Sequence, residues 1–428
     1  MRTDARPAQV RPVVNDYRLL GHPSDLAGHV TARGPLPIPT GPRAEWADRL
    51  VQVLEWSGLT GRGGAGFPSA RKLALARQDR RGVVVVNAME GEPASDKDKL
   101  LLLTAPHLVL DGAQVLAAAS GARQVTVCVP AGRDGVAAPV ERALQERRQL
   151  GYGAVPESLV RPPNRFVAGE ESALAAWLDR GHSRPAFRPD KGVALRIGSG
   201  PALVHNAETL AHIALIVRDD GHSFRQRGLT EEPGTTLVTL SGAVAQPGVV
   251  EVDRGTPLDQ IVARSRPIGP IAALQIGGYG GAWVGPAHFT TPYASIPLRT
   301  IGASAGVGVI VVLGAGSCGL AETARVVQYM AGQSSGQCGP CVFGLPAIAD
   351  DLGRLAQGRP DPDLMPRLRR RLEEVDGRGG CRHPDGVVGL VRSALDVFAD
   401  DVRAHLSTAP CPHVHQPTRF RFPAGTVV

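Results

Sequence analysis

The sequence predicts an α/β protein that continues into a β-rich region and ends in a helical region. Strand-like runs of β-branched residues alternate with amphipathic helical patterns up to about residue 230. Short strand patterns follow to about residue 315, and helical periodicity alone continues to about residue 405. We therefore expect a layered α/β domain, a small β module and a helical bundle.

The α/β part begins with a helix near Trp46, because apolar residues recur at helical spacing through Leu54 and Gly58 then ends the pattern. The run Val83–Val86 is entirely β-branched, as buried parallel strands are, and Gln124–Val129 resembles it. Further helices are expected at about 107–119, 134–148 and 170–179.

The later elements follow from Thr235 onwards. The β module has expected strands at Leu237–Leu240, Val249–Val252, Ile271–Ile276 and Val307–Leu313, with a short helix after Pro257. The helices beyond it, which are sufficient for a four-helix bundle, are expected at about 318–332, 341–356, 365–374 and 385–405. The predicted divisions are an N-terminal arm 1–45, domains 46–232, 233–315 and 316–406, and a C-terminal tail 407–428. The arm is rich in Pro, Arg and Gly without a period, so we expect it to lie over the body or to be partly disordered.

Composition excludes several classes of protein. A length of 428 residues excludes a small disulfide scaffold. The residues are 43% hydrophobic and 20% charged, as in ordinary globular proteins. No apolar run approaches the roughly 20 residues of a membrane helix, so we expect a globular protein without a membrane span. The net charge of +7 comes almost entirely from arginine, as in GC-rich genomes, and no basic run is interleaved with aromatic residues. Nucleic acid is therefore not an expected partner.

The six cysteines point to metal chemistry. The N-terminus has no apolar signal-peptide core, which argues for a cytoplasmic protein, where clustered cysteines hold metal more often than they form disulfides. Cys338, Cys341 and Cys381 lie in the helical region, so any metal site belongs there. Cys318 is expected to pack as a small buried hydrophobic residue.

A glycine-rich loop, Gly61-Arg62-Gly63-Gly64-Ala65-Gly66, lies between two helical patterns. Its backbone N–H groups are open to a phosphate, and the next helix would add its positive end. No strand precedes the loop and its glycines do not follow the dinucleotide fingerprint, so a plain flexible turn is an equal interpretation.

Two acidic segments offer hydrogen-bonding groups. Asn87, Glu90 and Glu92 follow the strand Val83–Val86, at the strand end where open α/β sheets bind ligands. The alternative is a solvated acidic loop. Glu170 and Glu171 lie in the first turn of a helix, where acidic residues ordinarily complement the helix dipole.

Together these segments carry a resemblance. GRGGAGFPSARK, NAMEGEPASDKDK, AGEESAL and the later CGPC…C are similar to motifs of the NADH-oxidising flavoprotein subunit of respiratory complex I and its relatives in NAD-linked hydrogenases and formate dehydrogenases. The resemblance covers about residues 46–405, in family order. It implies a Rossmann-like FMN-binding domain, a β-grasp module and a four-helix bundle with a 4Fe-4S cluster.

The resemblance also implies site residues. Those on the FMN side are Gly61, Gly63, Gly64, Lys72, Asn87, Glu90, Gly169, Glu170, Glu171 and Asn206. Those for NADH are Phe67, Glu92, Arg184 and Phe187, with the two rings placed to stack on adenine. Four positions depart from the family's usual residues. Met89 stands where an Asp is usual, removing an acceptor from the flavin loop, and Arg184 stands where a lysine is usual. Leu75 replaces an aromatic residue that helps to hold adenine, and His205 replaces an asparagine.

The implied cluster ligands are Ser335, Cys338, Cys341 and Cys381. Serine replaces the first cysteine of the family's CxxCxxC run, so the site holds either a 4Fe-4S cluster with an alkoxide ligand or a 3Fe-4S cluster. Electrons would leave through a ferredoxin or another iron–sulfur carrier subunit, on a cytoplasmic protein or one peripheral to a membrane complex. The competing interpretation is a zinc site of Cys338, Cys341, Cys381 and His383 in a non-catalytic, partner-binding relative.

Overall fold

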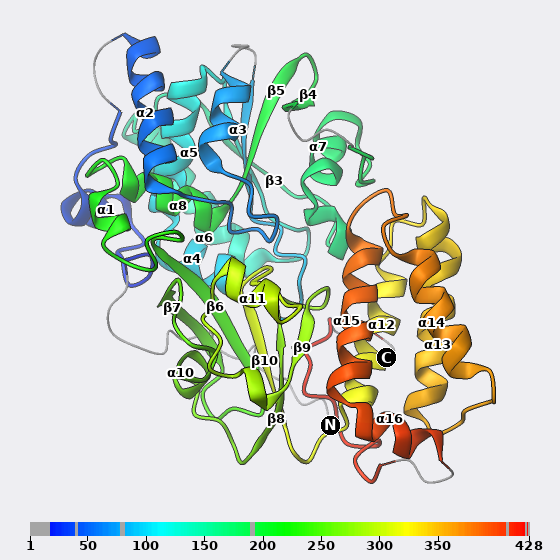
Figure 1. Cartoon of the computed structure of the whole chain (residues 1–428). Helices are drawn as coiled ribbons and strands as arrows, with labels where there is room; N and C mark the ends of the chain where they lie inside the picture. Colours follow the sequence, from blue (N-terminus) through cyan, green and yellow to red (C-terminus); the bar gives the residue numbers. More distant parts are fainter. Residues whose placement is uncertain are drawn as a thin grey trace, which may run out of the picture.

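The computed structural model describes residues 18–38, 42–77, 82–188, 193–407, 411–423 and 426. Two five-stranded sheets lie one beyond the other, and the C-terminal helices stand beside them (Figure 1). The α/β, β-rich and helical regions thus follow one another along the chain as the sequence predicts.

The first sheet has the order β3-β2-β1-β5-β4, in which only the edge strand β4 is antiparallel to its neighbour. It contains the two predicted strands and three that the sequence reading lacked. Its strands are β1 (Val83–Asn87), β2 (Val125–Cys128), β3 (Glu157–Val160), β4 (Leu195–Ile197) and β5 (Gly200–Asn206).

Alternate residues of β1 enter two different apolar clusters, because successive side chains of a strand point to opposite faces. Val84 and Val86 pack in the larger cluster, which includes residues of α5 and α8, whereas Val83 and Val85 pack in a small cluster with Leu174 of α7. The helices of this region are α2 (Arg43–Ser57), α3 (Ser69–Ala76), α4 (Lys97–Thr104), α5 (Pro106–Ser120), α6 (Asp134–Gln149), η1 (Phe166–Gly169), α7 (Glu171–Arg180), α8 (Ala207–Ile216) and α9 (His222–Arg225).

The second sheet has the order β7-β6-β10-β8-β9. Strands β6 and β10 are parallel to each other, and the other neighbouring pairs are antiparallel. The elements are β6 (Thr235–Gly242), β7 (Gly248–Asp253), α10 (Leu258–Ala263), β8 (Ile271–Ile276), β9 (Ala282–Val284), η2 (Pro286–His288), α11 (Ser295–Thr300) and β10 (Val309–Gly314).

The C-terminal region is helical, as predicted, with one difference. The single helix expected over 385–405 is two helices, because Phe398 leaves helical geometry (φ −105°, ψ 34°) while its ring packs 5.0 Å from that of Trp283. The elements are α12 (Gly319–Gly332), the π-helical turn η3 (Pro340–Gly344), α13 (Leu345–Ala356), α14 (Leu364–Val375), α15 (His383–Val397) and α16 (Ala399–Leu406).

Both chain ends are more ordered than the sequence predicts. In the described part of the expected arm, α1 (Leu26–Arg33) is a helix, and its His29 lies fully buried with Nε2 2.9 Å from Asp111 Oδ2. The described part of the arm therefore lies over the body, which is the first of the two expected alternatives, and regular structure begins before Trp46. Residues 1–17 of the arm lie outside the described residues. In the tail, the ring of Phe420 is buried and lies 5.6 Å from that of Tyr279.

Among the described residues, no single helix is both long and apolar enough to cross a bilayer. Helices α4 and α5 together have the length and apolar composition of a membrane span, but the chain bends by 96° between them.

Candidate functional site

The site lies at the carboxyl edge of the first sheet. Asn87 and Asn206 are paired in register at the ends of the parallel strands β1 and β5, and both line a cavity of about 1060 Å³. Ligand sites are usually about 300–1,000 Å³, so this space is large enough for a mononucleotide and part of a second nucleotide. A smaller cavity of about 310 Å³ adjoins it and shares both asparagines in its wall.

The glycine-rich loop forms one wall of the larger cavity. Gly61 N–H donates to the Phe67 carbonyl at 2.9 Å, which closes the loop, and Gly64 takes a φ of +101° that favours glycine. The Arg62 backbone N–H donates to Thr209 Oγ1 at 2.9 Å, while its buried guanidinium donates to the Thr235 carbonyl at 3.2 Å. The loop is therefore not a plain flexible turn, because hydrogen bonds from both the backbone and the side chain of Arg62 hold it in place.

Lys72 places an ammonium group on the cavity wall. Its Nζ donates to Glu171 Oε1 at 2.7 Å and to the Val204 carbonyl at 2.9 Å. The lysine comes from α3 and the glutamate from α7, so this ion pair joins the two helices across the cavity. Both side chains stay partly exposed.

The loop after β1 is not a solvated acidic loop. Glu90 caps α4, since its carboxylate accepts from Ser95 Oγ at 2.8 Å and from the N–H groups of Asp98 at 2.9 Å and Lys99 at 3.1 Å. Glu92 is buried, and its carboxylate accepts from the Ala94 N–H at 3.2 Å and the Tyr279 N–H at 2.8 Å. Burial, chiefly, raises the pKa of each carboxyl to about 7. Both glutamates line the smaller cavity rather than the larger one.

Met89 does not face either cavity. Its side chain is 1% exposed and packs with Val83, Leu174 and Val204 behind the sheet. The sequence reading treated this position as one that had lost an acceptor for the flavin. In the structure Met89 is instead part of the apolar core, which explains why a methionine is accommodated there.

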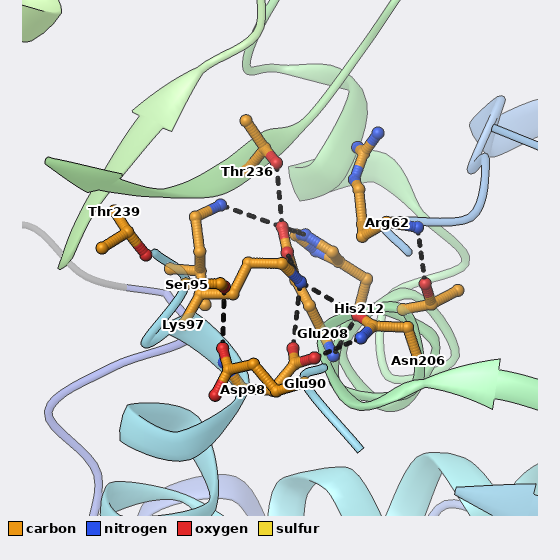
Figure 2. A network of polar contacts seen from close by, with 12 residues as sticks. Arg62, Glu90, Ser95, Lys97, Asp98, Asn206, Glu208, His212, Thr236 and Thr239 are labelled. Atoms are coloured by element: carbon orange, nitrogen blue, oxygen red, sulfur yellow. Dashed lines mark hydrogen bonds and ion pairs between the residues drawn. The ribbon is translucent and has the colours of Figure 1, made fainter. Parts of the chain in front are cut away.

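A buried polar network lies beneath Asn206 (Figure 2). Lys97 Nζ lies 2.8 Å from Glu208 Oε2, 2.9 Å from Asp98 Oδ1 and 3.1 Å from Asn206 Oδ1. Burial lowers the pKa of Lys97, but the carboxylates of Asp98 and Glu208 outweigh it and raise the pKa above its ordinary value. Glu208 also accepts from Thr236 Oγ1 and the Leu237 N–H, both at 2.9 Å, so the network joins the two sheets.

Sequence reasoning did not assign this network. The signal for it was the scarcity of lysine, because Lys97 is one of only four lysines and lies in a motif segment.

The start of α7 closes another side of the larger cavity. Glu170 caps the helix, since its Oε2 accepts from the N–H groups of Ser172 at 3.0 Å and Ala173 at 2.9 Å. The Gly169 carbonyl accepts from Asn87 Nδ2 at 2.9 Å, which ties this turn to the end of β1. Gly169, Glu170 and Glu171 all line the cavity.

Two phenylalanines lie at the larger cavity. Phe67 lies next to the glycine loop, with the Arg71 guanidinium 5.7 Å from the centre of its ring, and Phe187 is 74% exposed. A large apolar ring exposed at a cavity is available for stacking on a flat ligand. Arg184 is exposed and lies outside the cavity lining, so the structure does not bring it together with the two rings.

The cysteine-bearing loops of the helical region reach the same cavities. Cys381 and Arg382 line both cavities, beside residues of the glycine loop and α7. Gln337 Nε2 donates to the Pro185 carbonyl at 2.6 Å, and Phe166 N–H donates to Gln333 Oε1 at 3.1 Å, so contacts on both sides hold these loops against the first domain. Burial is the main cause that raises the pKa of the Cys341 thiol to about 12.

Ser335 fits a cluster ligand. Its Oγ is buried and has no hydrogen-bond partner, which is unusual for a buried hydroxyl. Cys338 and Cys341 follow at the spacing of three that lets one loop wrap a cluster, and η3 starts between them at Pro340.

The competing zinc set does not converge. His383 Nε2 lies 2.9 Å from the Met330 carbonyl, which leaves Nδ1 as the nitrogen for a metal, but no group of three metal-binding atoms within 4.8 Å of one another includes His383 among the described residues. In the part of the chain that the structure describes, the one group of three metal-binding side chains with all ligand atoms within 4.8 Å is Cys318, His405 and Cys411. Cys318 is buried in an apolar cluster, as expected, and its Sγ also lies 3.7 Å from His405 Nε2, a contact that the sequence did not predict.

Comparisons with known proteins agree with this geometry. The model of the Nuo51 FMN-binding domain matches residues 54–215, and that of the NADH-ubiquinone oxidoreductase-F iron-sulfur binding region matches residues 321–405. The chain is 27% identical to an F subunit of the NADH-quinone oxidoreductase of Rhizobium meliloti, covering 85% of this chain and 90% of that protein. It is 26% identical to the NADP-reducing hydrogenase subunit HndC of Solidesulfovibrio fructosivorans, covering 85% and 77%.

A solved structure is also similar. The NAD+-reducing [NiFe]-hydrogenase in the H2-reduced state superposes with a TM-score of 0.81 at 27% identity, covering 95% of this chain and 71% of that one.

The fold and the two matched regions define a flavin and iron–sulfur oxidoreductase. Most of the residues that line the larger cavity lie in the first matched region, and the Ser335–Cys341 loop and Cys381, which also lines this cavity, lie in the second. Over both matched regions, and over 85% of its length, the chain is similar to NADH-oxidising flavoprotein subunits such as the F subunits of NADH-quinone oxidoreductases.

Proposed function

We propose that the chain binds FMN and NADH in the larger cavity and holds an iron–sulfur cluster on the adjoining loops of the helical region. The main support for this proposal is that Cys381, a candidate cluster ligand, forms part of the wall of the larger cavity. Bound there, FMN would take the two electrons of a hydride from NADH and release them singly to the cluster. The chain's own side chains position these groups.

The FMN phosphate would lie against Gly61, Gly63 and Gly64, where open backbone N–H groups line the cavity. Lys72 would contribute a positive charge, held in place by Glu171. At the other side, Asn87 and Gly169 are joined by a hydrogen bond, and together with Asn206 they shape the floor of the cavity.

Glu90 and Glu170 act on the site indirectly. Their carboxylates cap α4 and α7, so we propose that they fix the loops that border the flavin. Asn206 is also fixed by hydrogen bonds. Its Oδ1 accepts from Lys97 Nζ and from the Glu208 N–H, both at 3.1 Å.

NADH would enter beside Phe67 and Phe187, whose rings offer flat apolar surfaces to the adenine. Glu92 lies in the wall of the smaller cavity and fixes the Tyr279 loop against the first domain. Arg184 stays a proposed contact for the NADH phosphates that would require movement of the exposed segment carrying it.

The cluster would be held by Ser335, Cys338, Cys341 and Cys381. Three soft thiolates suit iron in such clusters, and the orphaned Ser335 oxygen would supply the fourth, harder ligand. In this proposal, either a 4Fe-4S cluster uses all four ligands or a 3Fe-4S cluster leaves Ser335 free.

The domain plan is part of the proposal. The mixed sheet of residues 233–315 would be a β-grasp module, and the helices of residues 316–406 a four-helix bundle extended by α16. Because the relatives are named as subunits, we propose that electrons leave to a separate iron–sulfur carrier, a ferredoxin or a carrier subunit.

The test is anaerobic purification followed by flavin, iron, sulfide and zinc analysis, with stopped-flow mixing of the protein and NADH. We expect about one FMN, three to four iron atoms with matching sulfide, and rapid bleaching of the flavin absorbance. A protein that contains no flavin after FMN is supplied, or one that NADH does not reduce, would contradict the proposal.

A further inference from the structure

A second group of metal-binding side chains lies at the far end of the helical region. Cys318 Sγ, His405 Nε2 and Cys411 Sγ all lie within 4.8 Å of one another. The three residues come from separate segments: Cys318 is the N-cap of α12, His405 lies in the last turn of α16 and Cys411 belongs to the tail. Folding therefore brings together ligands that are far apart in the sequence.

This group is distinct from the cluster site. Cys318 precedes α12 and Ser335 follows it, and a helix of 14 residues spans roughly 20 Å. The two sets of ligands lie at opposite ends of the same helix. Figure 1 shows α16 at the end of the helical region away from α7.

The histidine is arranged as a metal ligand. His405 is fully buried, and its Nδ1 lies 3.1 Å from the Leu355 carbonyl. Since a carbonyl only accepts, Nδ1 carries the proton and Nε2 presents its lone pair to the two sulfur atoms. A backbone carbonyl on the far nitrogen is the support that metal-binding histidines ordinarily have.

The distances fit a tetrahedral ion. A Zn–S bond of about 2.3 Å and a Zn–N bond of about 2.05 Å at the tetrahedral angle place sulfur and nitrogen about 3.6 Å apart. The distance from Cys318 Sγ to His405 Nε2 is 3.7 Å. The same 3.7 Å is also the length of a hydrogen bond between a thiol and Nε2. Two further contacts are a 3.3 Å hydrogen bond from the Cys411 N–H to Nε2 and another of 3.3 Å from the Ala321 N–H to Cys318 Sγ.

We propose that Cys318, His405 and Cys411 bind one Zn²⁺ ion, with a solvent molecule as the fourth ligand. Cys411 is only half-buried, which leaves one side open to solvent. As the ion binds, each thiol forms a Zn–S bond and releases its proton to solvent, so the two thiolates balance the charge of the ion.

The ion would fasten the tail to the helices. Beyond Cys411 the tail continues back to the other two domains, where the Arg421 guanidinium contacts Asp96 of the first and the Tyr279 hydroxyl of the second donates to the Arg421 carbonyl. On the way, Thr418 Oγ1 and the Arg419 N–H donate to Glu322 at 2.6 and 2.9 Å. A zinc ion at the start of this segment would hold it in register along α12.

The experiment measures zinc on the full chain, purified anaerobically with its flavin and cluster and dialysed against buffer containing zinc. Zinc K-edge X-ray absorption is not obscured by iron or flavin. We expect about one zinc per chain with two sulfur neighbours at about 2.3 Å and nitrogen or oxygen neighbours at about 2.0–2.1 Å.

Cys411→Ala should lower the zinc content at least tenfold, whereas the control Cys128→Ala, which removes a buried thiol of β2, should leave it unchanged. Three findings would overturn the proposal: zinc below a tenth of an equivalent, a shell of three or more sulfur atoms, or a Cys318–Cys411 disulfide in the purified protein. The absorption spectrum of the wild type decides the matter even if Cys411→Ala does not fold. Flavin and iron contents, measured on the same sample, keep this outcome separate from the proposed redox function.

Discussion

Asn87 and Asn206 stand side by side at the ends of two parallel strands, and each amide is held by a partner from another segment. Asn87 donates to the Gly169 carbonyl at 2.9 Å, and Asn206 donates to the Asp98 carboxylate. The floor of the nucleotide cavity is thus fixed before any ligand enters, which reduces the entropy lost on binding.

Lys72→Met should weaken FMN binding by roughly 10–100-fold, because it removes a positive charge beside the glycine loop and leaves Glu171 unpaired. The measurement is FMN titration of flavin-depleted protein by fluorescence quenching. Lys99→Met is the matched control, since Lys99 lies outside both cavities. Equal FMN affinity of the two variants would show that Lys72 does not contact the phosphate.

Phe187→Ala should raise the apparent Kd for NADH by roughly tenfold, the equivalent of about 1–1.5 kcal/mol of lost stacking, and leave the flavin spectrum nearly unchanged. Stopped-flow reduction at a series of NADH concentrations measures it. Leu150→Ala removes a comparably exposed apolar side chain, 71% against 74%, away from the cavity. If both variants bind NADH like the wild type, the ring only covers the loop that carries it.

Ser335→Cys should give a cluster that survives oxidation longer, because a thiolate suits iron better than an alkoxide. Electron paramagnetic resonance of the oxidised protein should then show less of the 3Fe-4S signal. The control Ser199→Cys adds a thiol in an exposed turn beyond β4. Identical spectra and air stability for Ser335→Cys and wild type would exclude this serine from the cluster.

The contribution of Glu92 to thermal stability should fall as the pH rises from about 4.5 to about 7. Burial raises the pKa of Glu92 from 4.5 to about 7, so in this window the folded chain holds a proton that the unfolded chain has lost. The loss for one such group is at most about 3 kcal/mol. Glu92→Gln should therefore gain melting temperature relative to the wild type as the pH rises through this window, because only the wild type loses the Glu92 contribution. Buried histidines such as His107 and His212, whose pKa values burial lowers to about 4 and about 3, act in the opposite direction in both proteins, so the difference between the two profiles reports on Glu92.

The comparison for this pH series is Glu141→Gln, which alters an exposed glutamate of α6. Its slope should equal that of the wild type. A Glu92→Gln profile that runs parallel to both would mean that the pKa of Glu92 is the same in the folded and in the unfolded chain.

The sequence predicts elements well where one periodicity dominates. Val83–Val86 is a buried parallel strand, and its β-branched run is typical of one. Helix α8 was missed because all ten of its residues are buried, from Ala207 to Ile216, so it has no polar face to mark a helical period. The break at Phe398 depends on its contact with Trp283, which is 115 positions away and leaves no local signal.

Of the site, the sequence predicts the segments better than the roles of their side chains. The family motifs contain Lys72, Asn87, Gly169 and Asn206, and all four residues line the larger cavity. It does not reveal that the Glu90 carboxylate turns to the amides of α4, because that orientation depends on a backbone φ of +37° at this residue. The group of Cys318, His405 and Cys411 follows no motif and exists only through tertiary packing.

Cys381 lines the cavity that would admit NADH, so whatever enters the cavity would also reach a cluster held by this residue. Dioxygen can follow the same route as the nucleotide. An occupied cavity would therefore shield the iron, and the enzyme should lose its cluster to air most quickly when nucleotide is scarce. Damage by oxygen would in this way be tied to the supply of substrate.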